Sequence, residues 1–332
     1  MWIRTLLAML LLAAAFAPTA CRTPVDRVFA LPLDHPPTES DWENAVPLRA
    51  QAKGGRTTRA DEASVDADAV HKATASCHHG TQAPPVDLEV RAFYTPERVY
   101  LRITWSDPTL HRGPGWSWDG SSWRRGPSGQ DGVAVLWGAG VEGFTCVKAC
   151  HLADFRMAGP RAFADYRMAS PEGWGRLDLW EWKAGWGSLD GAADDLFLAP
   201  GGREPDVPGE RFVENRVPEA GGPVEAPDPE PGARAPAFLD RAPPSGRTEV
   251  EAVGRWTAGW WSVTFSRALQ GADPGDVALE PGGVYPVGIA LLDGVSQDHN
   301  AVAEPVRIWL VPGERLRSGG EARVAADAGA RL

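Results

Sequence analysis

Short runs of alternating apolar and polar residues recur along the chain and predict β-strands. Residues 87–93 and 99–105 alternate with period two, and the turn at 95–98 joins them into a hairpin. Residues 131–137 form a more continuous apolar strand. Further strands are predicted at 249–256, 260–265, 285–292 and 305–311. Because no regular helical pattern separates these runs, the chain is predicted to be all-β, with the strands in an antiparallel β-sandwich.

The parts of the chain outside these strands predict how it is organised. An N-terminal segment has Arg4 followed by an apolar run of about a dozen residues, which is typical of an export signal and too short to span a bilayer. The sandwich is expected to be one domain. The expected organisation is a signal peptide at 1–20, an extended Pro-rich lead over the surface at 21–40, the domain at 41–312 with long loops at 50–85 and 200–247, and a flexible tail at 313–332.

The end of the export segment can be interpreted in two ways. Ala20-Cys21 resembles a lipoprotein junction that would place a lipid on Cys21, although Pro18 stands where a leucine is usual. Ala15-Phe16-Ala17 fits plain secretion, although Pro18 would then follow the cut. Both interpretations predict an exported protein that is periplasmic or lipid-anchored to the outer face of a membrane.

Composition and charge narrow the function. The 332 residues carry a formal net charge of -11, which argues against nucleic acid as a partner. Gly 37 and Pro 30 fit strands joined by many turns, and 15 tryptophans are unusual beside 4 tyrosines. The sequence offers no phosphate-binding loop and no Ser/His/Asp arrangement. We therefore expect that the protein is not an enzyme in its own right.

The sharpest chemical motif is Cys146-Val147-Lys148-Ala149-Cys150-His151. The usual c-type haem attachment is C-x-x-C-H, in which two thiols bond the haem vinyl groups and the adjacent histidine ligates iron. Here three residues separate the cysteines, but the second still directly precedes a histidine. The alternative is a small Cys146–Cys150 disulfide in an exported protein, with His151 merely exposed.

Two further groups of residues are weaker candidates. Thr74-Ala75-Ser76-Cys77-His78-His79 resembles the same motif with its first cysteine replaced, so Cys77 and His78 either hold a second haem through one thioether or belong to a polar loop, which we favour. Only Met157 and Met168 remain in the mature chain, and both closely follow His151. A thioether suits haem iron, although a methionine more often fills a gap in a core.

The run Asp178-Leu179-Trp180-Glu181-Trp182-Lys183 adds aromatic candidates. If it is a regular strand, Trp180 and Trp182 point to the same side and wall either a cofactor or the core. Lys183 would then point to the opposite face, which makes it a weaker candidate for an iron ligand.

Short motifs follow one another over residues 40–312 in a distinctive order. They are Trp42-x-x-Ala45, W-x-D-P-T at 105–109, D-x-x-A-x-x-W at 131–137, C-x-x-x-C-H at 146–151, Met168, D-x-W-x-W-K at 178–183, A-D-D at 193–195, W-x-V-x-F-x-R-x-L at 261–269, Asp293-Gly294 and Trp309. This order resembles the haem-binding domain family of ethylbenzene dehydrogenase and DMSO-reductase-type gamma subunits, including its c-type cytochrome members.

The resemblance implies an Ig-like β-sandwich that holds haem and passes electrons. Family members without covalent haem are thought to ligate haem b with methionine and lysine, and Met168 matches the methionine position. At the lysine position this chain has Arg255, whose guanidinium stays protonated and cannot ligate iron. The resemblance therefore implies a c-type haem held by Cys146 and Cys150, with His151 and Met168 as iron ligands. By the same analogy, a membrane cytochrome b or a periplasmic oxidoreductase is the expected redox partner.

One alternative from another functional class remains. The same sandwich architecture serves carbohydrate-binding modules, and exposed tryptophans could stack on sugar rings. In that case the protein would be a haem-free carbohydrate- or ligand-binding module, and Cys146 and Cys150 would form a disulfide.

Overall fold

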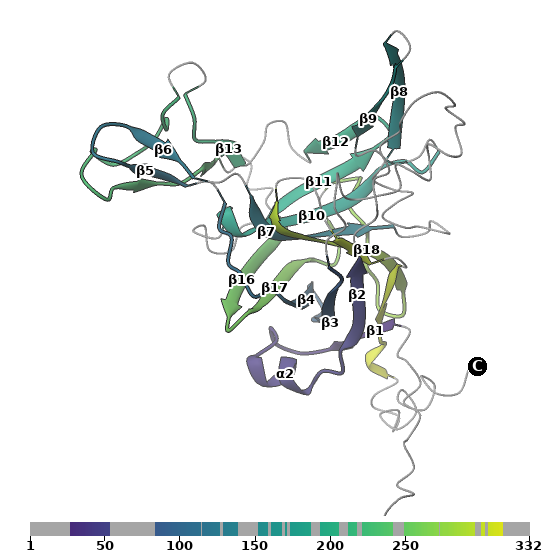
Figure 1. The fold of residues 1–332 in the computed structure, drawn as a ribbon. Helices are drawn as coiled ribbons and strands as arrows, with labels where there is room; N and C mark the ends of the chain where they lie inside the picture. The colour runs from purple at the N-terminus through teal and green to yellow at the C-terminus, as the bar shows by residue number, and fades with distance from the viewer. Residues whose placement is uncertain are drawn as a thin grey trace, which may run out of the picture.

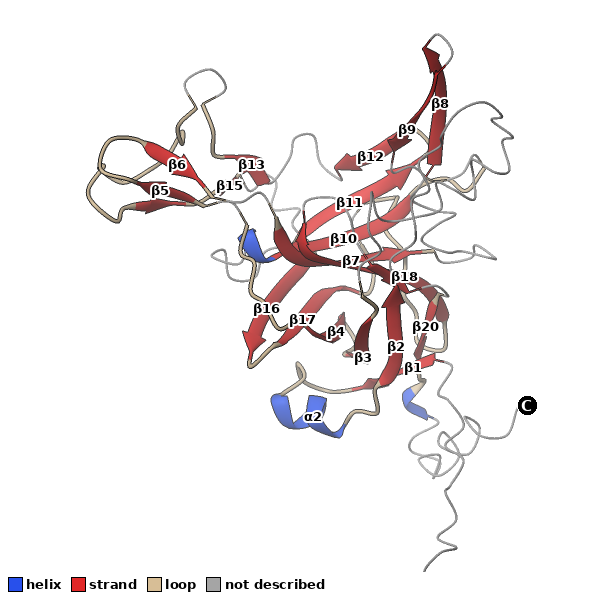
Figure 2. Ribbon diagram, viewed as in Figure 1, coloured by secondary structure: helices blue, strands red, loops and turns tan. Residues whose placement is uncertain are grey.

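The computed structural model confirms the all-β prediction. It describes residues 27–53, 84–113, 115–126, 129–138, 152–158, 161–167, 170, 173–186, 193–205, 212–217, 221–241, 249–271, 273–295, 300–302 and 305–314. For residues 152–158 and 161–167 the description is limited to the backbone. Within these ranges strands dominate, joined by a short α-helix, α2 (Glu39–Asn44), and a 3-10 turn, η1 (Ala184–Trp186) (Figure 2).

One large sheet of 13 strands organises the described residues (Figure 1). Its spatial order is β12 (Gly202–Pro205), β11 (Asp194–Ala199), β10 (Leu177–Lys183), β7 (Gln130–Trp137), β18 (Val284–Val295), β19 (Asn300–Val302), β2 (Leu48–Lys53), β3 (Val86–Tyr94), β4 (Arg98–Ser106), β17 (Trp260–Ala268) and β16 (Glu251–Thr257), with β1 (Arg27–Pro32) and β20 (Val306–Leu310) attached beside this path. The strands predicted from alternation coincide with β3, β4, β7, β16, β17, β18 and β20.

Three smaller sheets accompany the large one. They are β5 (Trp116–Trp118) with β6 (Trp123–Arg125) and β14 (Arg234–Ala235), β13 (Phe212–Glu214) with β15 (Phe238–Asp240), and the hairpin of β8 (Leu152–Ala158) and β9 (Arg161–Arg167).

The large sheet folds back on itself, and the core lies between its two halves. Alternation places one face of each strand inside, because successive side chains point to opposite sides. The β10 half packs on the β17 half: the Trp182 ring lies 5.1 Å from that of Trp261, and the Trp180 ring lies 6.1 Å from that of Phe265. Gly254 of β16 allows this approach, because a Cβ there would stand 2.1 Å from the Trp182 ring. The predicted sandwich is thus one sheet folded into two layers.

The N-terminal lead differs from its prediction. Residues 27–32 were expected to lie over the surface, but β1 pairs in parallel with β20, Arg27 opposite Arg307, and with β3. Val28 and Ala30 are buried in the core. The alternation in Arg27-Val28-Phe29-Ala30 places Val28 and Ala30 on the core side of the strand. The pairings of β18, β20, β1, β3, β2 and β19 then form a closed ring of six strands.

Helix α2 attaches the next segment to the sheet. Its N-terminus is a capping box, in which Thr38 and Asp41 each bond the other's backbone amide. Trp42, on its inner face, is buried 5.0 Å from the Phe93 ring, and the guanidinium of Arg102 lies 4.4 Å from the Trp42 ring centre.

The predicted irregular loop at 200–247 contains ordered elements. Strands β12 to β15 lie within it. The side chain of Asn215 is buried and holds three backbone groups, donating to the carbonyls of Glu225 and Pro236 and accepting from the amide of Glu225. Trp116 donates to the carbonyl of Asn215 at 2.7 Å and so connects this loop to β5. The other predicted loop, 50–85, begins too early, because residues 50–53 belong to β2, which pairs with β3; residues 54–83 fall outside the description.

Among the described residues, no helix combines the length and apolar character needed to cross a membrane.

Candidate functional site

Most of the residues predicted to hold haem lie outside the described part of the chain. These are Cys77, His78, Cys146, Cys150, His151 and Met168, and the predicted lipidation residue Cys21 also lies outside it. Met157 lies in β8, of which the backbone alone is described.

The β8–β9 hairpin is the described element next to the C-x-x-x-C-H motif (upper right in Figure 1). Its antiparallel register pairs Leu152 with Arg167 at the open end and Ala158 with Arg161 at the turn. In sequence, His151 directly precedes Leu152 and Met168 directly follows Arg167. Met157 pairs with Ala162 near the opposite end of the ladder.

Trp180 and Trp182 lie on one face of β10, as the alternation predicts, and that face is the sandwich core. Both are almost fully buried. Trp180 packs against Trp137, with ring centres 4.8 Å apart. The indole N–H groups of Trp137 and Trp180 have no hydrogen-bond partner within the described residues.

Lys183 lies on the other face of β10, together with Glu181. Its Nζ atom is 3.0 Å from Oε1 of Glu181, whose second oxygen accepts from Arg203 at 2.5 Å. Burial by itself would raise the pKa of Glu181, but Arg203 and Lys183 outweigh it and lower the pKa to about 2. The ammonium of Lys183 is therefore engaged by a permanently ionised carboxylate.

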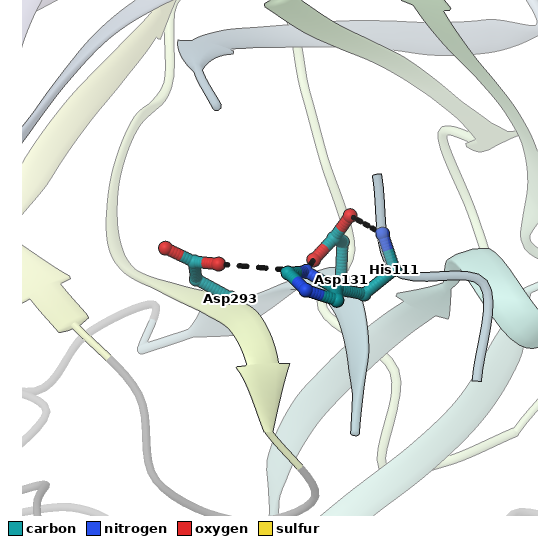
Figure 3. A group of neighbouring side chains, drawn as sticks. All are labelled: His111, Asp131 and Asp293. Carbon is teal, nitrogen blue, oxygen red and sulfur yellow. Dashed lines mark hydrogen bonds and ion pairs between the residues drawn. The ribbon is translucent and has the colours of Figure 1, made fainter. Parts of the chain in front are cut away.

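Sequence reasoning missed a polar cluster at one end of the sandwich, formed by His111, Asp131 and Asp293 (Figure 3). Asp131 lies at the start of β7 and is fully buried. Its Oδ2 atom accepts from the backbone N–H of His111 at 2.7 Å and from Trp261 Nε1 at 3.1 Å. Its Oδ1 atom accepts from the Gly294 amide at 3.0 Å and lies 3.2 Å from His111 Nδ1.

This arrangement connects three separate segments, those of His111, Trp261 and Gly294, to one carboxylate. One ligand atom from each of His111, Asp131 and Asp293 lies within 4.8 Å of the others, a spacing that suits a divalent cation. However, all four acceptor positions of Asp131 are used by nitrogen atoms of the protein. We therefore interpret the cluster as a structural clamp. Asp131 and Asp293 belong to sequence motifs noted above, but nothing in the sequence indicated that His111 joins them.

A second acidic group surrounds a buried arginine. Arg267 of β17 is fully buried and its guanidinium pairs with Oδ2 of Asp178, while Oδ1 of Asp276 lies 3.7 Å away. Asp195 joins these carboxylates. Burial raises the pKa of Asp178, Arg267 opposes this rise, and Asp276 adds to it. Because the Arg267 guanidinium lies among these carboxylates, we interpret the group as an internal ion network.

Asp107 lies near the clamp and is nearly fully buried. Its Oδ1 atom accepts from the amide and the hydroxyl of Thr109, whereas its Oδ2 atom has no hydrogen-bond partner in the described part of the chain. Burial raises the pKa of Asp107 to about 6; the Thr109 bonds oppose the rise, and the charges of Asp131 and Asp293 add to it.

Replacing Asp107 by asparagine should change how stability depends on pH. The folded pKa of about 6 lies above the ordinary value of 3.8, so the folded carboxyl binds its proton more tightly and wild-type stability falls as pH rises between these values. Asparagine keeps an acceptor for Thr109 and removes this titration. Urea midpoints of Asp107→Asn, relative to wild type, should therefore be higher at pH 7.5 than at pH 4.5. An offset that is the same at both pH values would contradict the assignment.

Comparison with known proteins gives a family and a weak structural likeness. The family model described as "Ethylbenzene dehydrogenase" matches residues 39–302. No curated protein matches the chain. A family 9 carbohydrate-binding module from Caldicellulosiruptor kristjanssonii in complex with cellotriose matches with a TM-score of 0.32 and 10% identity, over 86% of this chain and 94% of that one. A putative carbohydrate-binding protein from Bacteroides uniformis gives 0.25 and 10%, over 67% and 70%. Likeness at this level carries no functional argument.

Proposed function

Because the chain belongs to the ethylbenzene dehydrogenase family, we propose that it is an exported haem-binding protein that transfers electrons to or from a membrane or periplasmic redox partner. The observation that carries the proposal is the family match over residues 39–302, which encloses the C-x-x-x-C-H motif at 146–151. The acidic charge of the chain favours a partner with a basic docking face.

The proposed attachment is covalent. The thiols of Cys146 and Cys150 form thioethers with the haem, and His151 is the proximal ligand, a donor set that fits c-type haem. Bound haem supplies a one-electron couple. The protein contributes the ligands and the low-polarity surroundings that set the potential. A lipid on Cys21 would keep the protein at a membrane surface and close to its partner.

The backbone register supports Met168 as the second iron ligand. Leu152 and Arg167 are partners in the β8–β9 ladder, and in the sequence His151 directly precedes Leu152 while Met168 directly follows Arg167. Met157 lies five residues along β8 from Leu152, about 17 Å at the usual strand rise. The ladder therefore favours Met168 over Met157 as the partner of His151.

The remaining candidates have smaller parts in the proposal. Lys183 is paired with Glu181 on the face opposite the tryptophans, which disfavours it as an iron ligand. Cys77 and His78 form a polar loop in this proposal, so one haem per chain is expected. Trp180 and Trp182 belong to the core cluster, and the proposal gives them a packing role.

The decisive experiment is a pyridine haemochrome spectrum of protein produced with c-type maturation machinery, before and after acid–acetone extraction. We expect haem that resists extraction and that is lost from Cys146→Ser/Cys150→Ser. Haem that extracts completely would contradict the covalent attachment. Folded protein without haem would overturn the proposed function and favour the binding module.

The two methionines provide a matched pair of variants. Met168→Ala should abolish the far-red charge-transfer band of methionine-ligated ferric haem and lower the reduction potential, because a thioether ligand raises the potential. Met157→Ala should leave both unchanged. The reverse pattern would transfer the ligand role to Met157.

A further inference from the structure

The outer face of β2, β3, β4, β17 and β16 is a continuous polar surface. Alternation turns one set of side chains inward to the core and the other set outward. The register aligns five outward residues in one row across the strands: Arg49, Glu89, Thr104, Ser262 and Arg255. An adjacent row contains Ser106, Trp260 and Thr257.

Two hollows lie on this face. The first, of about 510 Å³, lies between the sheet and α2, and Glu39 and Trp42 form part of its wall. The second, of about 600 Å³, lies over β2 and β3 and includes Arg49 and Glu89. Trp260 lines both hollows, so a ligand that crosses the strands would pass over its ring.

Trp260 is a large aromatic side chain that the fold leaves open. Its side chain is 48% exposed, whereas the neighbouring Trp261 is buried in the core. Ala258 and Gly259 form the tight turn before it, with φ of 50° and 84°. Trp260 pairs with Ser106 on one side and Thr257 on the other, which holds its backbone in place. An exposed indole on a strand held in this way offers a flat apolar surface to a ligand.

Polar groups beside this tryptophan are available to a ligand. The side chains of Thr104, Ser262 and Arg255 are adjacent in register, and none of them makes a hydrogen bond or ion pair within the described residues. Arg255 is the residue at the position where the resemblance led us to expect an iron-ligating lysine. Because Arg255 lies on the outer face and lines the first hollow, its guanidinium can contact a ligand there.

The charges of the surface favour an uncharged ligand. In the first hollow Glu39 and Glu251 balance Arg102 and Arg255, and Arg102 binds Glu39 with both terminal nitrogens at 2.8 and 2.9 Å. The second hollow adds Arg49 against Asp87 and Glu89. The surface therefore offers no excess positive charge, and the net charge of -11 repels polyanions.

We propose that this face binds a neutral oligosaccharide, with a pyranose ring stacked on Trp260 and its hydroxyl groups bonded to Thr104, Ser262 and Arg255. Four inter-strand steps from β2 to β16 span about 19 Å, so several sugar units fit across the face. This binding does not depend on haem, and it would attach the exported protein to a glycan surface.

Affinity electrophoresis of the full mature chain tests the proposal. Native gels contain hydroxyethyl cellulose, xyloglucan or galactomannan, with sodium alginate as the anionic polymer. We expect at least one neutral polymer to retard the wild type. Trp260→Ala should weaken that binding at least about tenfold, and Arg255→Ala should weaken it as well. Trp123→Ala is the control, because Trp123 is a partly exposed tryptophan of β6 that does not line either hollow.

Three results would overturn the proposal: no neutral polymer retards the wild type, Trp260→Ala is retarded like the wild type, or alginate alone binds. Haem content measured on the same samples keeps the two proposals separate. Loss of glycan binding in Trp260→Ala with unchanged haem supports this face as an independent site. A haem-free protein that binds glycan would overturn electron transfer and leave this inference standing.

Discussion

Arg267→Met should lower the free energy of unfolding by about 3–5 kcal/mol, because it leaves buried carboxylates without their counter-charge. Arg267 is fully buried, pairs with Asp178, and donates to the carbonyls of Val277 and, at 3.2 Å, Ala268. Its guanidinium also lies 5.1 Å from the Trp180 ring centre. Methionine fills part of the volume but satisfies none of these groups.

The double variant Arg267→Met/Asp178→Asn is the control for charge. Removing both members of a buried pair is much less costly than removing one, and asparagine keeps an acceptor for the Val277 amide, which donates to Asp178 at 3.1 Å. We expect urea denaturation to show the double variant more stable than Arg267→Met.

Arg267→Met should also lose less stability at pH 5 than at pH 8, because protonation at pH 5 neutralises the buried Asp178. Equal losses in both variants would show that packing, and not charge, sets the cost.

Asp131→Ala should cost about 3 kcal/mol or more, since it removes the acceptor of several buried donors at once. The variant leaves the His111 and Gly294 amides and the Trp261 indole without their acceptor, and it removes the side-chain link between β7 and these three groups. Trp261 packs against Trp182 and Trp105, so the unpartnered indole N–H would lie inside the core.

Asp293→Ala is the matched control from the same cluster. Its side chain is 57% exposed, and its contact with His111 Nδ1 is a 3.8 Å ion pair. Removing such a group usually changes stability by less than about 0.5 kcal/mol. Urea unfolding followed by tryptophan fluorescence measures both variants. Similar losses for Asp131→Ala and Asp293→Ala would contradict the clamp and indicate a shared role such as cation binding.

The sequence predicted the strands that have one face in the core. In β4, Val99, Leu101, Ile103 and Trp105 are buried and alternate with half-exposed residues, so the period of two was visible. In β10 both faces are covered, one by the main core and the other by a second cluster around Leu177 and Leu179. Such a strand loses its alternation, which is why this run could be treated only conditionally as a strand.

Tertiary contacts between distant residues could not be derived in the same way. Arg267 and Asp178 were recognised as positions in motifs, but their pairing depends on β10 and β17 facing each other across the core. His111 carries no pattern of its own, because its position comes from the loop that follows β4. The row of Thr104, Ser262 and Arg255 exists only through the register of three strands. Periodicity locates strands and inward faces, whereas sites built from several strands require the pairing.

The closed ring of strands has a consequence for how the chain reaches its folded state. Arg27 of β1 is paired with Arg307 of β20, 280 positions later. Because a chain is synthesised from its N-terminus, β1 emerges early and its partner β20 almost last. Until β20 has formed, one edge of β1 has no partner strand, although β1 carries the apolar residues Val28 and Ala30. Unpaired apolar strands are prone to aggregate, so we expect the chain to be most prone to aggregation before β20 has paired.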